Sequence, residues 1–214
     1  MINLQKEVIE FAKKLNSTNL SPLRSGNISV RTTQNGKDGF YITPSGIKYQ
    51  TLKEGDIVFV SSNGEYNKEG LQPSSEWKFH KDIYLKKSEA KAIVHAHSPH
   101  ATAVSAHNKD IPAFHYMIAL AGGDNIKCAK YGTFGTQELS DNIIAALENR
   151  KACLMSNHGQ VAFGDSLNSA FELAEELENI CHQYINAIKL GKPKILSSSE
   201  MNLILEKVKN YKKG

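Results

Sequence analysis

Short apolar runs alternate with longer amphipathic segments along the whole chain of 214 residues, and this alternation most constrains the fold. The runs are bounded by glycine or polar turns and include "GNISVR", "DIVFV", "AIVHAHS" and "ACLM", each the length of a β-strand. The segments between them have helical spacing, and the longest covers 166–191 and ends at Gly191. No linker rich in proline, glycine or serine divides the pattern. The sequence therefore predicts one α/β domain over residues 1–214.

The segment "PSSEWKFH" opens a helix expected from Ser75 to about Lys87. A proline, two hydroxyls and an acid suit a helix N-terminus, whose free N–H groups and dipole favour oxygen and negative charge. The same groups would also bind a phosphate, and Glu76 could be a metal ligand or a proton carrier. The local pattern leaves both roles open, a helix cap and a functional site.

The most informative stretch is "AIVHAHS". His95 and His97 are two residues apart in an expected strand, so both side chains project from one face. Two protonated imidazoles side by side would repel each other, whereas a bound dication keeps both neutral. The pair therefore indicates a metal site, with two ordinary hydrogen-bonded histidines as the alternative.

A third histidine, His158, lies in "SNHGQ", a turn-prone segment between two expected strands. Three histidines leave a tetrahedral metal one ligand short, and Glu76 is an available carboxylate. A site with an exchangeable position suits a catalytic metal that polarises a carbonyl. His80 follows Glu76 by one helical turn and could hold it in place. The other candidates are assigned structural roles: His100, His107 and His182.

Three segments carry groups that commonly bind anions: glycines that allow close backbone approach, and hydroxyl or amide side chains. Each segment is also a common turn, so each is weak evidence alone. No Walker loop or dinucleotide-binding glycine fingerprint is present. The candidate anion ligands are Gly26 and Asn27 in "SGNIS", Thr43, Ser45 and Gly46 in "TPSG", and Ser74 and Ser75 in "PSSEW".

Charge and cysteine usage narrow the class of protein. Much of the net charge of +4 lies in "KLGKPK" and the terminal "EKVKNYKKG", which is typical of a solvated tail and not of a nucleic-acid surface. No apolar run approaches the roughly 20 residues that cross a bilayer, and the N-terminal segment lacks a secretory hydrophobic region. Three scattered cysteines argue against a disulfide scaffold. We therefore expect a cytoplasmic protein without nucleic-acid or membrane partners.

Five motifs occur in order along the chain: "GNISVR", "ITPSG", "PSSEW", "HAHS" and "NHG". In this order and spacing they resemble the class II aldolase/adducin family of zinc-dependent sugar-phosphate enzymes. The similarity extends from the first helix to almost the C-terminus. It implies an α/β fold with a central, mostly antiparallel sheet flanked by helices on both faces, and a mobile tail at about 207–214.

The resemblance also implies roles for individual residues. His95, His97 and His158 would bind Zn²⁺, and Glu76 would be the acid/base, able to contact the metal when no substrate is present. The phosphate of the substrate would be held by Asn27, Thr43, Gly46, Ser74 and Ser75, with Gly26 and Ser45 nearby.

The aldehyde end of the substrate would be contacted by residues from elsewhere in the chain. Tyr116 would reach it as a catalytic residue from a neighbouring subunit of a homotetramer, so that active sites lie at subunit interfaces. Phe134 would help to close the same region, and Tyr211 resembles a catalytic tyrosine of a mobile tail.

The implied activity is reversible cleavage of a ketose 1-phosphate to dihydroxyacetone phosphate and a small aldehyde. The stretch "HYMIALAGG…YGTFGT" favours L-fuculose 1-phosphate as the ketose and L-lactaldehyde as the aldehyde. Other activities of the family remain open: an aldolase for another deoxypentulose 1-phosphate, L-ribulose-5-phosphate 4-epimerase and methylthioribulose-1-phosphate dehydratase. A non-catalytic, adducin-like interaction module is a further alternative, although such a module should have lost metal ligands or Glu76.

Overall fold

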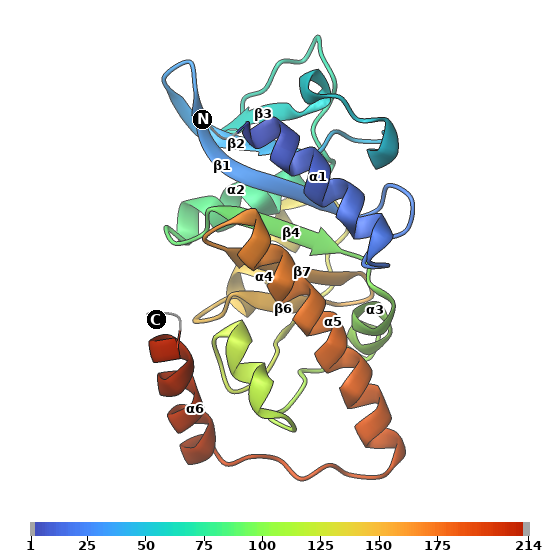
Figure 1. Cartoon of the computed structure of the whole chain (residues 1–214), viewed down its shortest axis with the longest axis vertical. Helices are drawn as coiled ribbons and strands as arrows, with labels where there is room; N and C mark the ends of the chain where they lie inside the picture. Colours follow the sequence, from blue (N-terminus) through green and yellow to red (C-terminus); the bar gives the residue numbers. More distant parts are fainter. Residues whose placement is uncertain (1–2, 212–214) are drawn as a thin grey trace.

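A seven-stranded sheet in the order β3-β2-β1-β4-β7-β6-β5 runs through the centre of the molecule (Figure 1). The computed structural model describes residues 3–211, except the side chain of Tyr211. Neighbouring strands are antiparallel apart from β5 and β6, which confirms the predicted mostly antiparallel sheet. The strands are β1 (Asn27–Gln34), β2 (Lys37–Ile42), β3 (Val58–Ser61), β4 (Ala92–Ala96), β5 (Cys128–Ala129), β6 (Ala152–Met155) and β7 (Gly159–Gly164).

Helices cover both faces of this sheet, as predicted; α1 and α5 cross its front and α2 and α4 lie behind it (Figure 1). The alternation of side chains along β4 explains the two layers, since Val94 packs with the α1 and α5 side and Ile93 with the α2 and α4 side. The α-helices are α1 (Leu4–Ser17), α2 (Trp77–Lys86), α3 (Pro99–Ser105), α4 (Gln137–Ala146), α5 (Leu167–Lys189) and α6 (Ser198–Tyr211). Short 3-10 helices span Tyr49–Thr51, Glu54–Asp56 and Tyr116–Ala121, the last being η3.

Capping side chains fix several helix ends where the sequence places them. Thr136 caps α4, because its side chain accepts a hydrogen bond from the backbone N–H of Leu139. Ser197 and Glu200 exchange side-chain and backbone hydrogen bonds at the start of α6. Helix α6 continues to Tyr211, so residues 207–211 of the expected mobile tail are helical, and residues 212–214 lie outside the described part.

The start of α2 differs from the prediction. The helix begins at Trp77, and Glu76 occupies the N-cap position without making a side-chain capping hydrogen bond. Ser74 instead accepts a hydrogen bond on Oγ from the backbone N–H of Glu76, at 3.4 Å. The acid expected in the first helical turn is therefore one position outside it, and its carboxylate is free to turn toward the sheet.

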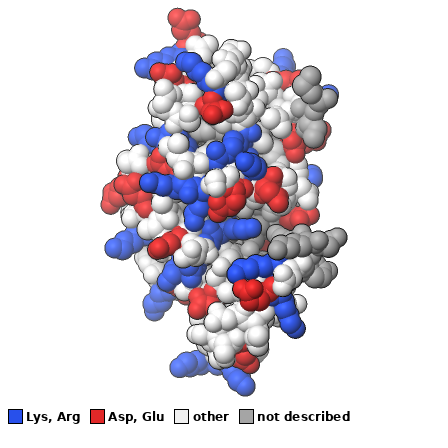
Figure 2. All heavy atoms as spheres, turned by 90° about the vertical axis from the view of Figure 1, so that its left-hand side faces the viewer, with Lys and Arg blue, Asp and Glu red and all other residues white. Residues whose placement is uncertain are grey.

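The surface shows no concentration of one charge on the face drawn in Figure 2, where basic and acidic side chains are interspersed. Within residues 3–211, none of the helices combines the length and the apolar character that a membrane span requires.

Candidate metal centre and anion pocket

Three histidines meet at the end of β4. His95 lies in β4, His97 follows the strand, and His158 lies in the turn between β6 and β7. Because β7 pairs with β4 so that Val161 is opposite His95, that turn is brought beside the end of β4. The ring centroids of the three imidazoles are 4.8–4.9 Å apart. Gly159 permits this approach, since a Cβ there would lie 2.3 Å from the carbonyl oxygen of Ala96.

The carboxylate of Glu76 completes the group. Its Oε2 lies 3.1 Å from Nε2 of His95, and its Oε1 lies 3.3 Å from Nε2 of His158. One potential ligand atom from each of Glu76, His95, His97 and His158 lies within 4.8 Å of the others. The structure thus brings together the four residues that the resemblance implied as metal ligands.

The hydrogen bonds of His95 test whether these residues fit a metal. His95 Nδ1 lies 2.8 Å from the carbonyl oxygen of Gln160, which only accepts, so the proton of neutral His95 is on Nδ1. The Nε2 lone pair of neutral His95 then faces Glu76 Oε2, and this contact between two acceptors is relieved by a proton on His95 or by a bound metal cation. Glu76 Oε1 is also buried without a hydrogen-bond partner. Three imidazoles and one carboxylate therefore fit a divalent cation.

Burial and mutual charge set the protonation of this group. Burial acts to raise the pKa of Glu76, but the neighbouring histidines, led by His95, outweigh it and lower that pKa to about 2. Burial, reinforced by His95, lowers the pKa of His97 to about 3 and that of His158 to about 4. For His95, burial acts to lower the pKa, and the Glu76 carboxylate overcomes it and raises the pKa. At neutral pH, Glu76, His97 and His158 have the deprotonated forms that bind metals.

Acid should therefore weaken metal binding by protonating one ligand, His95. A proton on His95 competes with the metal, and its raised pKa places this competition at and above the ordinary histidine value of about 6.5. We expect the apparent metal affinity to fall about tenfold per pH unit between pH 6.5 and pH 5. Titration of the protein against a fluorescent metal indicator at several pH values measures this slope. A slope of about a hundredfold per unit in that range would contradict it, because a second ligand, His97 or His158, would then also be titrating.

A cavity of about 380 Å³ opens beside Glu76. Two of its turns have glycines with left-handed backbone, Gly26 and Gly46, each with φ of +76°. A side chain at Gly26 would also strike the carbonyl oxygen of His95, at 2.6 Å. The predicted anion ligands that line the cavity are Gly26, Asn27, Ser45, Gly46, Ser74 and Ser75. The cavity and the histidine cluster are continuous, since His97 and His158 line it too.

The remaining predicted residues are placed differently. Thr43 is fully buried and does not line the cavity, and its Oγ1 accepts a hydrogen bond from the backbone N–H of Ile28 at 3.2 Å. Phe134 lines the cavity and is 65% exposed. Tyr116 lies in η3, is 54% exposed and is not part of the cavity wall formed by this chain. The side chain of Tyr211 lies outside the described residues.

Sequence reasoning missed several cavity residues, and Arg24 is the charged one among them. Arg24 lines the cavity and donates a hydrogen bond from Nη1 to the carbonyl oxygen of Gly46, at 3.0 Å. It links the two glycine turns and is the one Lys or Arg among the described residues that line this cavity. The signal was a basic residue two positions before the Gly26–Asn27 turn, but proximity to Gly46 depends on long-range pairing of β1 with β2.

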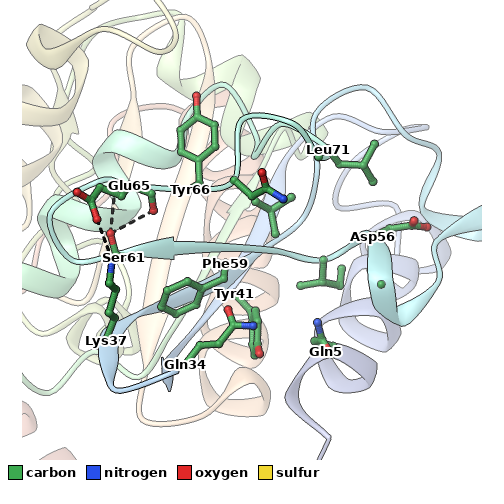
Figure 3. Close-up of a pocket in the computed structure, with 15 residues that line it drawn as sticks. Gln5, Gln34, Lys37, Tyr41, Asp56, Phe59, Ser61, Glu65, Tyr66 and Leu71 are labelled. Atoms are coloured by element: carbon green, nitrogen blue, oxygen red, sulfur yellow. Dashed lines mark hydrogen bonds and ion pairs between the residues drawn. The ribbon is translucent and has the colours of Figure 1, made fainter.

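A larger cavity, of about 570 Å³, lies along the edge strand β3 (Figure 3). Tyr41 and Phe59 contribute aromatic surface there, and Lys37 forms an exposed ion pair with Glu65 at 3.2 Å. Among the described residues, the one group with metal-binding geometry is at the smaller cavity. The convergence of histidines, a carboxylate and glycine turns, and not cavity size, makes the smaller cavity the candidate site.

Comparison with known proteins points to the same chemistry. Residues 6–185 match the family described as Class II Aldolase and Adducin N-terminal domain. Over 209 residues the chain is 44% identical to L-fuculose phosphate aldolase of Escherichia coli (strain K12), covering 97% of this chain and 95% of that protein. It is 43% identical over 210 residues to 5-methylthioribulose-1-phosphate/5-deoxyribulose-1-phosphate aldolase of Rhodospirillum rubrum. This match covers 98% of this chain and 93% of that protein. A solved structure of an L-fuculose 1-phosphate aldolase matches with a TM-score of 0.91 and 39% identity, covering 98% of this chain and 97% of that chain.

Proposed function

Because the chain belongs to the class II aldolase and adducin family, we propose that it is a zinc-dependent aldolase that cleaves a ketose 1-phosphate reversibly. The products would be dihydroxyacetone phosphate and an aldehyde, with L-fuculose 1-phosphate as the ketose and L-lactaldehyde as the aldehyde. The observation that carries this proposal is the position of Glu76, a buried carboxylate between three convergent histidines and a cavity with anion-binding turns.

The polar groups of the cavity would hold the phosphate end of the substrate. Asn27, Ser74 and Ser75 line this cavity together with the Gly46 turn and would supply amide and hydroxyl groups to the phosphate. His95, His97 and His158, with Glu76 when no substrate is present, would hold the metal. When bound, the metal supplies a Lewis acid that polarises the ketose carbonyl.

Glu76 would carry the proton at C3. In condensation, its carboxylate accepts a proton from C3 of dihydroxyacetone phosphate, and the electron pair left on C3 forms the bond to the aldehyde carbon. Tyr116 of a neighbouring subunit would give its phenolic proton to the aldehyde oxygen. Cleavage reverses these steps: Tyr116 takes the C4 hydroxyl proton, the C3–C4 bond breaks, and protonated Glu76 returns a proton to C3. An oligomer follows as part of this proposal, because Tyr116 is not part of the cavity wall of its own chain, and the family resemblance favours a homotetramer.

A second substrate class has specific support. The 43% identity to the Rhodospirillum rubrum enzyme favours 5-deoxyribulose 1-phosphate or its methylthio analogue as an alternative ketose. These ketoses share the phosphate and the C3–C4 bond with L-fuculose 1-phosphate, so the same residues would act on them. The difference lies in the aldehyde, which the residues around Phe134 would contact.

Product identification tests the proposal. The purified protein is incubated with L-fuculose 1-phosphate, 5-deoxyribulose 1-phosphate and L-ribulose 5-phosphate, and free dihydroxyacetone phosphate is measured. We expect dihydroxyacetone phosphate from the first two, with the higher kcat/KM for L-fuculose 1-phosphate. Conversion of L-ribulose 5-phosphate to its C4 epimer, without release of dihydroxyacetone and glycolaldehyde phosphate, would instead establish an epimerase.

Arg24 should contribute to the binding of the phosphate. Replacement by methionine removes the one cationic side chain of the described cavity wall, so we expect KM to rise about three- to tenfold with little change in kcat. The loss should shrink at high salt because the guanidinium is near solvent. Arg24→Lys retains the charge and is the matched control, expected to lose less. Steady-state kinetics at two ionic strengths measure both variants, and an unchanged KM for Arg24→Met would contradict this role.

A further inference from the structure

A row of buried polar side chains continues inward from Glu76. Asn27 Nδ2 lies 3.0 Å from Glu76 Oε2, and Asn27 Oδ1 contacts His80 Nε2. Ser29 Oγ lies 2.6 Å from His80 Nδ1 and 2.7 Å from the hydroxyl of Tyr84. His80 and Ser29 are fully buried, and the other members are at most 6% exposed. We call the set Asn27, His80, Ser29 and Tyr84 the polar row.

The alternation of side chains along β1 and the helical spacing of α2 bring the residues of the polar row together. Asn27 and Ser29 are two residues apart on β1 and so share one face, the face that also carries His95 because Asn27 pairs opposite His95. His80 and Tyr84 are four residues apart on α2 and so share one side of that helix. The rings of Phe40 and Phe79 stack near His80, with centroids at 6.5 and 4.6 Å, and shield it from water.

The direction of each hydrogen bond in the polar row follows from the Glu76 carboxylate at one end, which can only accept. The Glu76 carboxylate only accepts, so Asn27 must present its NH2 group to it and its oxygen to His80. That oxygen also only accepts, so His80 carries its proton on Nε2. Burial lowers the pKa of His80 to about 3, so the ring is neutral and its Nδ1 accepts the hydroxyl proton of Ser29. Ser29 in turn accepts from the hydroxyl of Tyr84.

We propose that His80 is a positioning residue, whose Nε2–H fixes the amide of Asn27 with its nitrogen toward Glu76 and the anion cavity. Without this donor, only the contact with Glu76 would hold the amide of Asn27, and rotation of the amide by half a turn would become less unfavourable. Its oxygen would then face the Glu76 carboxylate and present partial negative charge to a bound phosphate. His80 touches neither substrate nor metal ligand in this role and acts through Asn27. The inference rests on the proposed function for its consequence in turnover, but not for the hydrogen-bond geometry.

Two substitutions of His80 distinguish the effect of its N–H donor from the effect of its packing volume. His80→Phe keeps a planar ring and has no donor, whereas His80→Gln keeps an N–H donor for Asn27. We expect His80→Phe to weaken binding of inorganic phosphate at least about tenfold, measured by calorimetry on the full-length protein, and to raise KM for the ketose phosphate similarly. His80→Gln should recover most of this loss. Equal losses in the two variants would overturn the proposal, because packing alone would then explain them.

A measurement on the unsubstituted protein adds a test that does not depend on ligand binding by the variants. ¹⁵N NMR of the imidazole side chains distinguishes a proton on Nε2 from one on Nδ1, and the His80 signals are identified by their loss in His80→Gln. We expect the neutral Nε2–H form; a proton on Nδ1 would overturn the proposal. These readouts need no turnover. If the protein cleaved no ketose phosphate, the proposed function would be wrong. The phosphate-binding and NMR measurements would still decide the role of His80.

Discussion

Replacing Glu76 by glutamine should slow exchange of the C3 proton of dihydroxyacetone phosphate by about 10²-fold or more while metal stays bound. The amide has nearly the shape of the carboxylate and keeps an oxygen for the contact with Asn27, but it cannot accept a proton. Three histidines remain as metal ligands. Exchange in D₂O followed by proton NMR, together with metal analysis of the same sample, measures both consequences.

Glu65→Gln is the matched control for this substitution. Glu65 lines the larger cavity at β3, and its carboxylate pairs with Lys37 near solvent, with 63% of the side chain exposed. Removing its charge should leave both exchange and metal content unchanged. If Glu76→Gln exchanged the proton at the original rate, Glu76 would have no part in proton transfer. If exchange slowed and the variant had lost its metal, the contribution of Glu76 would be ligation.

The parts of the site that sequence alone predicts are those set by local periodicity. The spacing of His95 and His97 places both imidazoles on one side whether the strand ends at Ala96, as it does, or beyond it. The turn at His158 is likewise a local feature, because the turn-prone residues Asn157 and Gly159 flank it in the sequence. The residue type made Glu76 an available fourth ligand, and family resemblance supported that hypothesis, but 19 positions separate it from His95 and no local rule spans that gap.

The parts that sequence reasoning missed depend on pairing between distant segments. Arg24 reaches Gly46 only because β1 and β2 form a hairpin that brings their flanking turns together. Thr43 has a hydroxyl that could bind an anion, yet this hydroxyl accepts a hydrogen bond from the backbone N–H of Ile28 on the neighbouring strand. The helical turn from Glu76 to His80 is visible in the sequence, but the direction of the hydrogen bonds is not. That direction depends on Asn27 and Ser29, which come from a strand about 50 residues earlier.

Replacing His97 by alanine should release the metal and reduce turnover to about 1% or less of the original. Removal of one of three imidazoles leaves two nitrogens and a carboxylate, and loss of even an outer hydrogen bond at such sites weakens metal binding about 10- to 100-fold. His97 is suited to this test because the fold depends less on it than on His95, which is fully buried and hydrogen-bonded to the backbone of Gln160. Metal content after gel filtration and the rate of ketose phosphate cleavage are the two measurements.

His107→Ala supplies the control for the loss of an imidazole. His107 is exposed in the segment after α3, outside the metal cluster and the anion cavity, so this variant should keep its metal and its activity. Treating the unsubstituted protein with a chelator should reproduce the His97→Ala result, and adding Zn²⁺ back should restore activity to the chelated protein but not at the same concentration to His97→Ala. That difference follows because the chelated protein keeps all four converging ligands, whereas the variant lacks one of them. A His97→Ala protein that is fully active without metal would contradict the metal-dependent proposal directly, since no other group of this kind exists among residues 3–211.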